Sequence, residues 1–87
     1  MTIKSDFILK EIAGSFVVIP IRSAAADLNG VIKLSESGAF LWNRLAEGAS
    51  REELISAMLS EYEVDPSRAA HDIDIFLNKL KEADLLA

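Results

Sequence analysis

The chain has 87 residues, 51% of them hydrophobic, so it has enough apolar material for one small core and we expect a single domain over residues 1–87. Its formal net charge of -5 argues against binding to nucleic-acid phosphates or to anionic membrane surfaces, because both attract basic proteins. It has no cysteine, which excludes disulfides and thiolate chemistry and is typical of the reducing cytoplasm, and no stretch approaches the roughly 18 apolar residues of a membrane span.

Three strands are predicted in the first part of the chain. Residues 7–12 and 16–21 are rich in β-branched and aromatic side chains, which favour strands. Residues 13–15, with a central glycine, predict a hairpin turn between them. A third, short strand is predicted over residues 31–34, after Asn29-Gly30, a pair that tolerates positive φ.

Three helices follow, and each has its own start signal. The first is predicted over residues 36–47 and has Ser35 as its N-cap. The second begins after Ser50, which forms a capping box with Glu53 three residues on. The third begins at Asp65-Pro66, a capping acid followed by a proline at the first helical position.

The order of these elements predicts the fold class and the core. Because the strands form one block and the helices another, we expect an α+β fold, winged-helix-like, with a three-stranded antiparallel sheet followed by three helices. Period-2 and helical spacings predict which apolar side chains are buried. The predicted core residues are Ile32, Leu34, Leu41, Trp42, Leu45, Leu54, Met58, Ile73, Phe76 and Leu80.

The sequence offers little material for catalysis. The single histidine, His71, has Asp72 and Asp74 near it on a helix but no further ligand in reach, so we interpret these residues as a solvated face. The adjacent carboxylates Glu52 and Glu53 are explained by helix capping and surface exposure. The glycines are scattered at turns, which excludes a phosphate-binding loop. We therefore predict no catalytic residue, no metal site and no cofactor.

A DNA-binding regulator is the alternative function. A hairpin followed by packed helices resembles a winged helix, whose last helix can enter the DNA major groove. The third predicted helix, however, mixes Asp72, Asp74 and Glu82 with its basic residues. This charge is unsuited to the phosphate backbone, so we predict no nucleic-acid partner.

Four sequence blocks, in this order, resemble the PqqD family, the peptide chaperones of pyrroloquinoline quinone biosynthesis. The family's wider relatives are the recognition elements for precursors of ribosomally made, modified peptides. The blocks are "LSESGAFLW" at 34–42, "GASREEL" at 48–54, "EYEVDP" at 61–66 and "FLNKLKEADLL" at 76–86. The resemblance covers nearly the whole chain.

The resemblance implies a non-catalytic domain that binds the leader segment of a precursor peptide. Such a domain presents the leader to a modifying enzyme, often a radical SAM enzyme. The leader adds as a strand to the edge of the third strand and lies in a groove against the third helix, which is the binding mode called β-augmentation. From the residues alone, an ordinary core strand with a blunted edge is equally compatible with residues 31–34.

These considerations give a candidate peptide-binding site on the third strand and the third helix. Two flanks of the third helix lie beside its core stripe, and the sequence does not choose between them. We expect the flank with Ala70 and Lys81 to line the groove, and the competitor contains Asp72, Ile75, Lys79 and Glu82. An exposed edge strand can also pair with a second copy, so a homodimer is a possible state. The predicted site residues are Val31, Ile32, Lys33, Leu34, Ala70, Asp74, Leu77 and Lys81.

Overall fold

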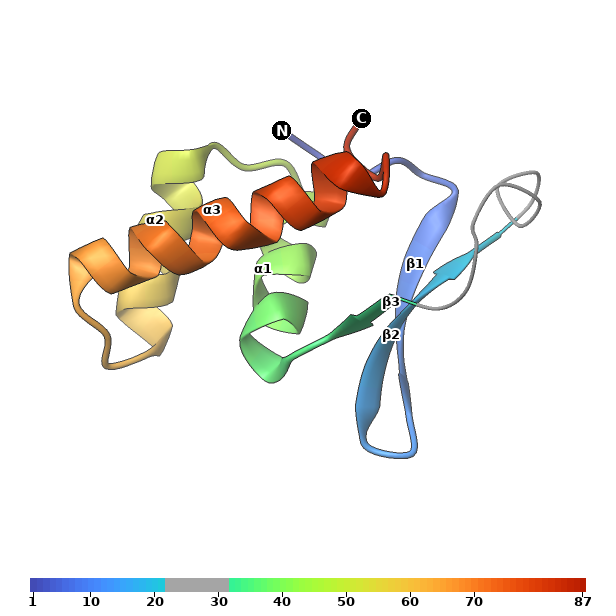
Figure 1. Ribbon diagram of the computed structural model, residues 1–87, viewed down its shortest axis with the longest axis horizontal. Coiled ribbons are helices and arrows are strands. Elements are labelled where there is room, and N and C mark those ends of the chain that lie inside the picture. Colours follow the sequence, from blue (N-terminus) through green and yellow to red (C-terminus); the bar gives the residue numbers. More distant parts are fainter. Residues whose placement is uncertain (22–31) are drawn as a thin grey trace.

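The computed structural model describes residues 1–21 and 32–87 and has the predicted α+β architecture (Figure 1). An antiparallel sheet lies at one end of an elongated molecule and the helices lie at the other (Figure 1). Val31 and the predicted Asn29-Gly30 pair lie outside the described residues. The strands are β1 (Phe7–Ile12), β2 (Ser15–Pro20) and β3 (Ile32–Leu34), and the helices are α1 (Glu36–Ala46), α2 (Arg51–Glu61) and α3 (Pro66–Glu82).

The sheet has the strand order β1-β2-β3, so β2 is its central strand. Leu9 lies opposite Val18 in the β1–β2 pair, and Phe16 lies opposite Leu34 in the β2–β3 pair. The hairpin turn is shorter than expected: Ala13 and Gly14 have φ angles of 52° and 80°, and the next residue already belongs to β2. Two consecutive residues with positive φ match the right-handed twist of a hairpin, which explains the two-residue turn.

All three predicted helix starts are confirmed. The Ser35 hydroxyl accepts a hydrogen bond from an amide of the first turn of α1. At α2, the Ser50 hydroxyl accepts from the Glu53 amide and the Glu53 carboxylate accepts from the Ser50 amide, which completes the capping box. At α3, Asp65 is the N-cap and Pro66 occupies the first helical position.

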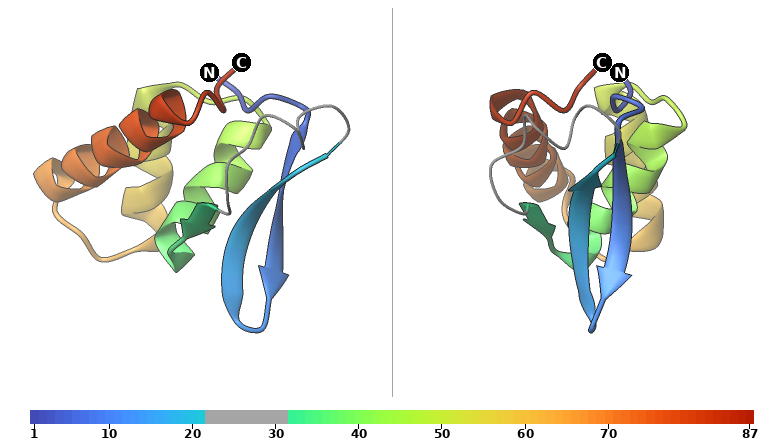
Figure 2. Two further views of the ribbon diagram at one scale, coloured as in Figure 1. Left: turned by 45° about the vertical axis from the view of Figure 1, so that its right-hand side comes forward. Right: turned by 90° about the vertical axis from the view of Figure 1, so that its right-hand side faces the viewer.

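The core lies between the helices and the inner face of the sheet. Every predicted core residue is buried except Ile32, which is partly exposed because it belongs to the edge strand. The core also contains side chains from β2 and from the C-terminal residues, among them Val18 and Leu85, which have no exposed surface. Both termini lie side by side (Figures 1 and 2), where Ile3 forms a β-bridge with Leu86.

Replacing Leu80 by Ala is expected to destabilise the domain by about 2–5 kcal/mol. Leu80 is fully buried, and its truncation leaves a cavity that the surrounding side chains fill only in part. Leu59→Ala on α2 is the control, since Leu59 is 37% exposed and should cost much less. Urea unfolding followed by the fluorescence of the single tryptophan, Trp42, which is buried, measures both variants. Equal losses in the two variants would contradict the packing described here.

Candidate functional site

The strand β3 forms one edge of the sheet, and no other described strand pairs with its outer side. The Lys33 carbonyl oxygen accepts a hydrogen bond from Nζ of Lys79 on α3, at 3.1 Å. The backbone groups of successive residues in a strand point in alternate directions. The backbone of Lys33 therefore points outward, away from β2, whereas the backbone groups of Ile32 and Leu34 point toward β2. Val31 lies outside the described residues, so its place in the site stays a prediction.

A one-residue connection fixes this edge strand against α1. Ser35 separates β3 from α1 and caps the helix by accepting from the Gly38 amide at 3.1 Å. A Cβ atom at Gly38 would lie 3.3 Å from Cβ of Leu34, closer than side chains usually approach. The missing side chain at Gly38 thus allows the end of β3 to pack directly on the first turn of α1.

A groove of about 330 Å³ lies between the end of β3, the first turn of α1 and one flank of α3. We call it the β3–α3 groove. Its lining is mostly apolar, and its most exposed apolar side chain is Ile75, which is 55% exposed. The lining residues are Leu34, Ser35, Ser37, Gly38, Leu41, Met58, Asp72, Ile75, Phe76 and Lys79.

The structure brings only some of the expected site residues together in this groove. Leu34 lines it, and Lys33 contributes its carbonyl oxygen to the contact with α3. Ile32 lies on the inner face of the same strand and is partly buried against the core. Together these residues form the strand side of the site.

The expected residues of α3 lie elsewhere. Asp74 forms a two-pronged ion pair with Arg51 at the start of α2, at 2.7 and 3.0 Å, and Leu77 is buried in the core. Together with Ala70 and Lys81 they belong to the flank that does not line the β3–α3 groove. The groove is instead lined by residues of the competing flank, so the structure does not bring the four expected residues of α3 into it.

The reason for this difference is the rotation of α3 about its axis. Helical spacing identified the buried stripe, but the side on which β3 lies depends on how α3 packs against α2, its main helical neighbour. The ion pair between Asp74 and Arg51 belongs to the side facing α2. Its partner is 23 positions away in the sequence, and no local pattern reveals it.

The two charged side chains that line the groove, Asp72 and Lys79, differ in whether they have an ion-pair partner. Asp72 is paired with Arg68 one helical turn away, at 3.2 Å. Lys79 donates to the Lys33 carbonyl and has no carboxylate within ion-pair distance among the described residues. The groove therefore presents one cation without an anionic partner beside the outward backbone of β3.

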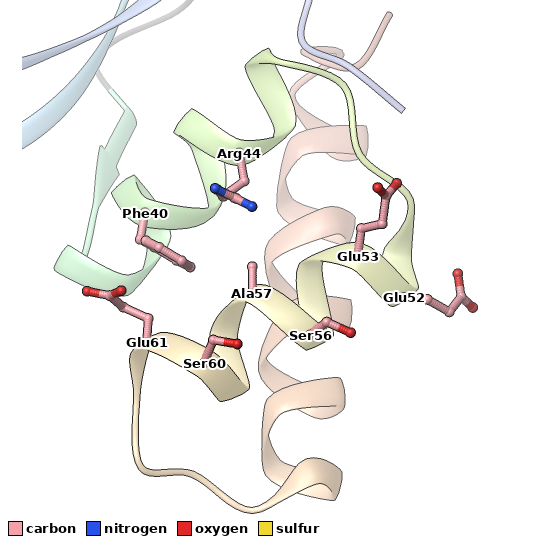
Figure 3. Close-up of a pocket in the computed structure, with 8 residues that line it drawn as sticks. All are labelled: Phe40, Arg44, Glu52, Glu53, Ser56, Ala57, Ser60 and Glu61. Carbon is pink, nitrogen blue, oxygen red and sulfur yellow. The ribbon is translucent and has the colours of Figure 1, made fainter.

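A second hollow of about 490 Å³ lies between α1 and α2, away from the edge of β3. Figure 3 shows Arg44 projecting from α1 over α2, with Phe40 and Glu61 at one end and Glu53 near the other. The hydrogen bond between the Glu53 carboxylate and the Ser50 backbone lowers the pKa of Glu53. A general acid needs a raised pKa, so the geometry supports a cap rather than an acid–base pair. The remaining lining residues are Glu52, Ser56, Ala57 and Ser60.

Residues 1–21 and 32–87 contain neither a metal-ligand cluster nor a membrane-spanning helix. Within these ranges no group of three or more His, Asp or Glu side chains is arranged to hold a metal ion, and His71 lies on the exposed surface. None of the described helices combines the length and apolarity needed to cross a bilayer.

Comparisons with known proteins identify a family and two similar solved structures. The model of the family described as "Coenzyme PQQ synthesis protein D (PqqD)" matches residues 15–86. One similar solved structure is TbiB1 in complex with the TbiA(beta) leader peptide, with 27% sequence identity and a TM-score of 0.78, covering 99% of this chain and 94% of that one. Another is lasso peptide synthetase B1 complexed with the leader peptide, with 25% identity and a TM-score of 0.72, covering 92% and 88%.

No curated protein sequence matches the chain significantly. The family match and the two structural matches give no support to the DNA-binding alternative. Both solved structures hold a leader peptide, and the site on this chain stays a prediction.

The variant Asp74→Asn is expected to melt at a lower temperature than the parent at pH 7. Hydrogen bonds from Arg51 lower the pKa of Asp74, so the stabilisation is present above the ordinary aspartate pKa of about 3.9 and is lost as the pH falls through the lowered pKa. Thermal melts from pH 7 to pH 2.5 should therefore show the difference shrinking in acid. A difference that stays constant over this range, or that persists in an Arg51→Ala background, would contradict the assignment.

Proposed function

The chain belongs to the PqqD family, and from this membership we propose that it binds the leader segment of a ribosomally made precursor peptide by adding it as a strand to the edge of β3. The proposal covers a non-catalytic role: the domain holds the leader and presents the rest of the precursor to a separate modifying enzyme, of the radical SAM type or another. The two similar structures described above hold leader peptides, which supports a peptide ligand here.

The observation that carries the proposal is an outward strand backbone directly beside an apolar groove. Lys33 presents its backbone to the open side of β3, and the β3–α3 groove follows the same edge. An extended peptide needs both features, because main-chain hydrogen bonds supply affinity and side-chain pockets supply selection. A strand that only completes the core does not require an exposed apolar side chain beside its edge. Ile75 is such a side chain, and it favours a binding edge.

On α3, we propose that the peptide contacts the flank that lines the groove. Ile75 and Phe76 provide apolar surface there, and Leu34 provides it from the strand. Buried apolar surface contributes about 25 cal/mol per Å², so one leader side chain in this groove is worth roughly 1.5–3 kcal/mol when fully buried. This is the same order as the contribution of a few main-chain hydrogen bonds.

We further propose that the domain acts in the cytoplasm, where ribosomes release precursor peptides. A homodimer formed through β3 would use the same backbone groups as the leader. Such a dimer is therefore proposed as a competitor of leader binding, and sedimentation with and without peptide measures this competition.

Proline at Lys33 should remove peptide binding and leave most of the fold intact. The Lys33 amide points outward, so Lys33→Pro removes a hydrogen bond to the leader, whereas Ile32→Pro removes one to β2 and should lower stability as well. The probes are synthetic leader regions from short precursor genes of the same genome, together with peptides selected from a random 12-residue display library. Thermal melting and fluorescence anisotropy measure the two effects. Unchanged binding by a folded Lys33→Pro protein would refute addition at this edge.

Replacing Ile75 by Asp should weaken binding of the same peptides about tenfold or more, because it places a charge in the apolar part of the groove. Stability should change little, since Ile75 is 55% exposed. Leu59→Asp on α2 is the matched control, as Leu59 is also exposed but lies outside the groove. Equal weakening by both variants would contradict binding in the β3–α3 groove.

A further inference from the structure

The contact between Lys79 and Lys33 occupies the acceptor that an added strand needs. Nζ of Lys79 lies 3.1 Å from the Lys33 carbonyl oxygen. In β-augmentation an amide of the incoming peptide donates to this same oxygen. The ammonium group must then share the carbonyl or leave it, and because Lys79 is exposed, either water or an anionic group of the peptide can replace the lost acceptor.

The strand geometry identifies which leader side chains reach this ammonium. A leader residue paired directly with Lys33 points its side chain to the same sheet face as the Lys33 side chain. Its two neighbours point to the opposite face, where Ile32 and Leu34 contact the helices. Two leader side chains separated by one residue therefore point into the β3–α3 groove.

The spacing of these two side chains matches one turn of α3. Residues two apart in a strand are separated by about 6.7 Å. Ile75 and Lys79 are four residues apart on a helix, which corresponds to a rise of about 6 Å. Figure 1 shows β3 and α3 running in roughly opposite directions, and the hydrogen bond from Lys79 to Lys33 connects them. One leader side chain thus lies beside Ile75 and Phe76 while the other lies beside Lys79.

The charge distribution selects the chemistry of the second side chain. Lys79 has no carboxylate partner among the described residues, whereas Asp72 is already paired with Arg68. The net charge of -5 repels acidic peptides at long range, but this repulsion is screened over about 8 Å at physiological salt. A direct contact with the exposed Lys79 ammonium acts well within this length, so it sets a modest preference for an acidic side chain at this position.

On this basis, and resting on the proposed function, we infer that the leader carries an Asp or Glu two residues away from the apolar side chain that fills the β3–α3 groove. Lys79 releases the Lys33 carbonyl to the leader amide and binds this carboxylate instead. Lys79 is thus a specificity-determining residue. The order of the acidic and apolar residues reports whether the leader runs parallel or antiparallel to β3.

Selection from a random 12-residue display library tests the inference. Peptides that bind the parent protein but not Lys33→Pro define binders of the β3 edge. Among them, an acidic residue at a spacing of two from an apolar residue should be enriched. This enrichment should disappear on Lys79→Ala, persist on the matched control Lys81→Ala, and change to Lys or Arg on Lys79→Glu. Melting curves establish that each variant is folded.

Binding constants of one selected peptide complete the test. Changing its acidic residue to the amide should weaken binding to the parent about three- to tenfold and to Lys79→Ala by less than about 1.5-fold. Edge binders without an acidic preference, or with one that survives Lys79→Ala, would overturn the inference and leave the proposed function intact. Uniformly tighter binding by Lys79→Ala would also overturn it, because Lys79 would then only guard the edge. A library without edge binders would refute the proposed function itself.

Discussion

The unpaired backbone of β3 is the feature on which the rest of the account depends. β3 has only three residues, so Lys33 alone presents its backbone amide and carbonyl to the open side of the strand. The hydrogen bonds of one residue are too few to bind a peptide by themselves, because each exposed hydrogen bond contributes little net free energy of binding. Affinity therefore requires apolar contacts close to the same backbone, and the β3–α3 groove supplies them.

Several parts of the molecule hold this short edge in place. The Ser35 cap and the close packing of Gly38 on Leu34 attach β3 to α1 with almost no connecting loop. The opposite side of the groove is formed by α3. This helix packs against α2, and the ion pair between Asp74 and Arg51 adds a contact between the two helices. The contacts of β3 with α1, and the packing of α3 on α2, therefore place the strand edge within reach of Lys79 on α3.

Local sequence signals predicted the fold well, but the site only in part. Caps such as Ser50 and the helical spacing of the core residues depend on neighbours in sequence, and the structure confirms them. The groove flank of α3 was missed because it depends on the rotation of the helix, which a distant partner, Arg51, helps to fix. Ile75 was a usable signal: an isoleucine outside the buried stripe of an amphipathic helix is a candidate contact for a partner.

Hydrogen exchange at the Lys33 amide, measured by NMR with and without a saturating edge-binding peptide, tests the central claim most directly. If the peptide adds to β3, this amide becomes hydrogen-bonded and its exchange should slow at least tenfold. The amides of Ile32 and Leu34 already face β2 and should change much less. Unchanged exchange at Lys33 in a protein saturated with peptide would show that the leader binds elsewhere.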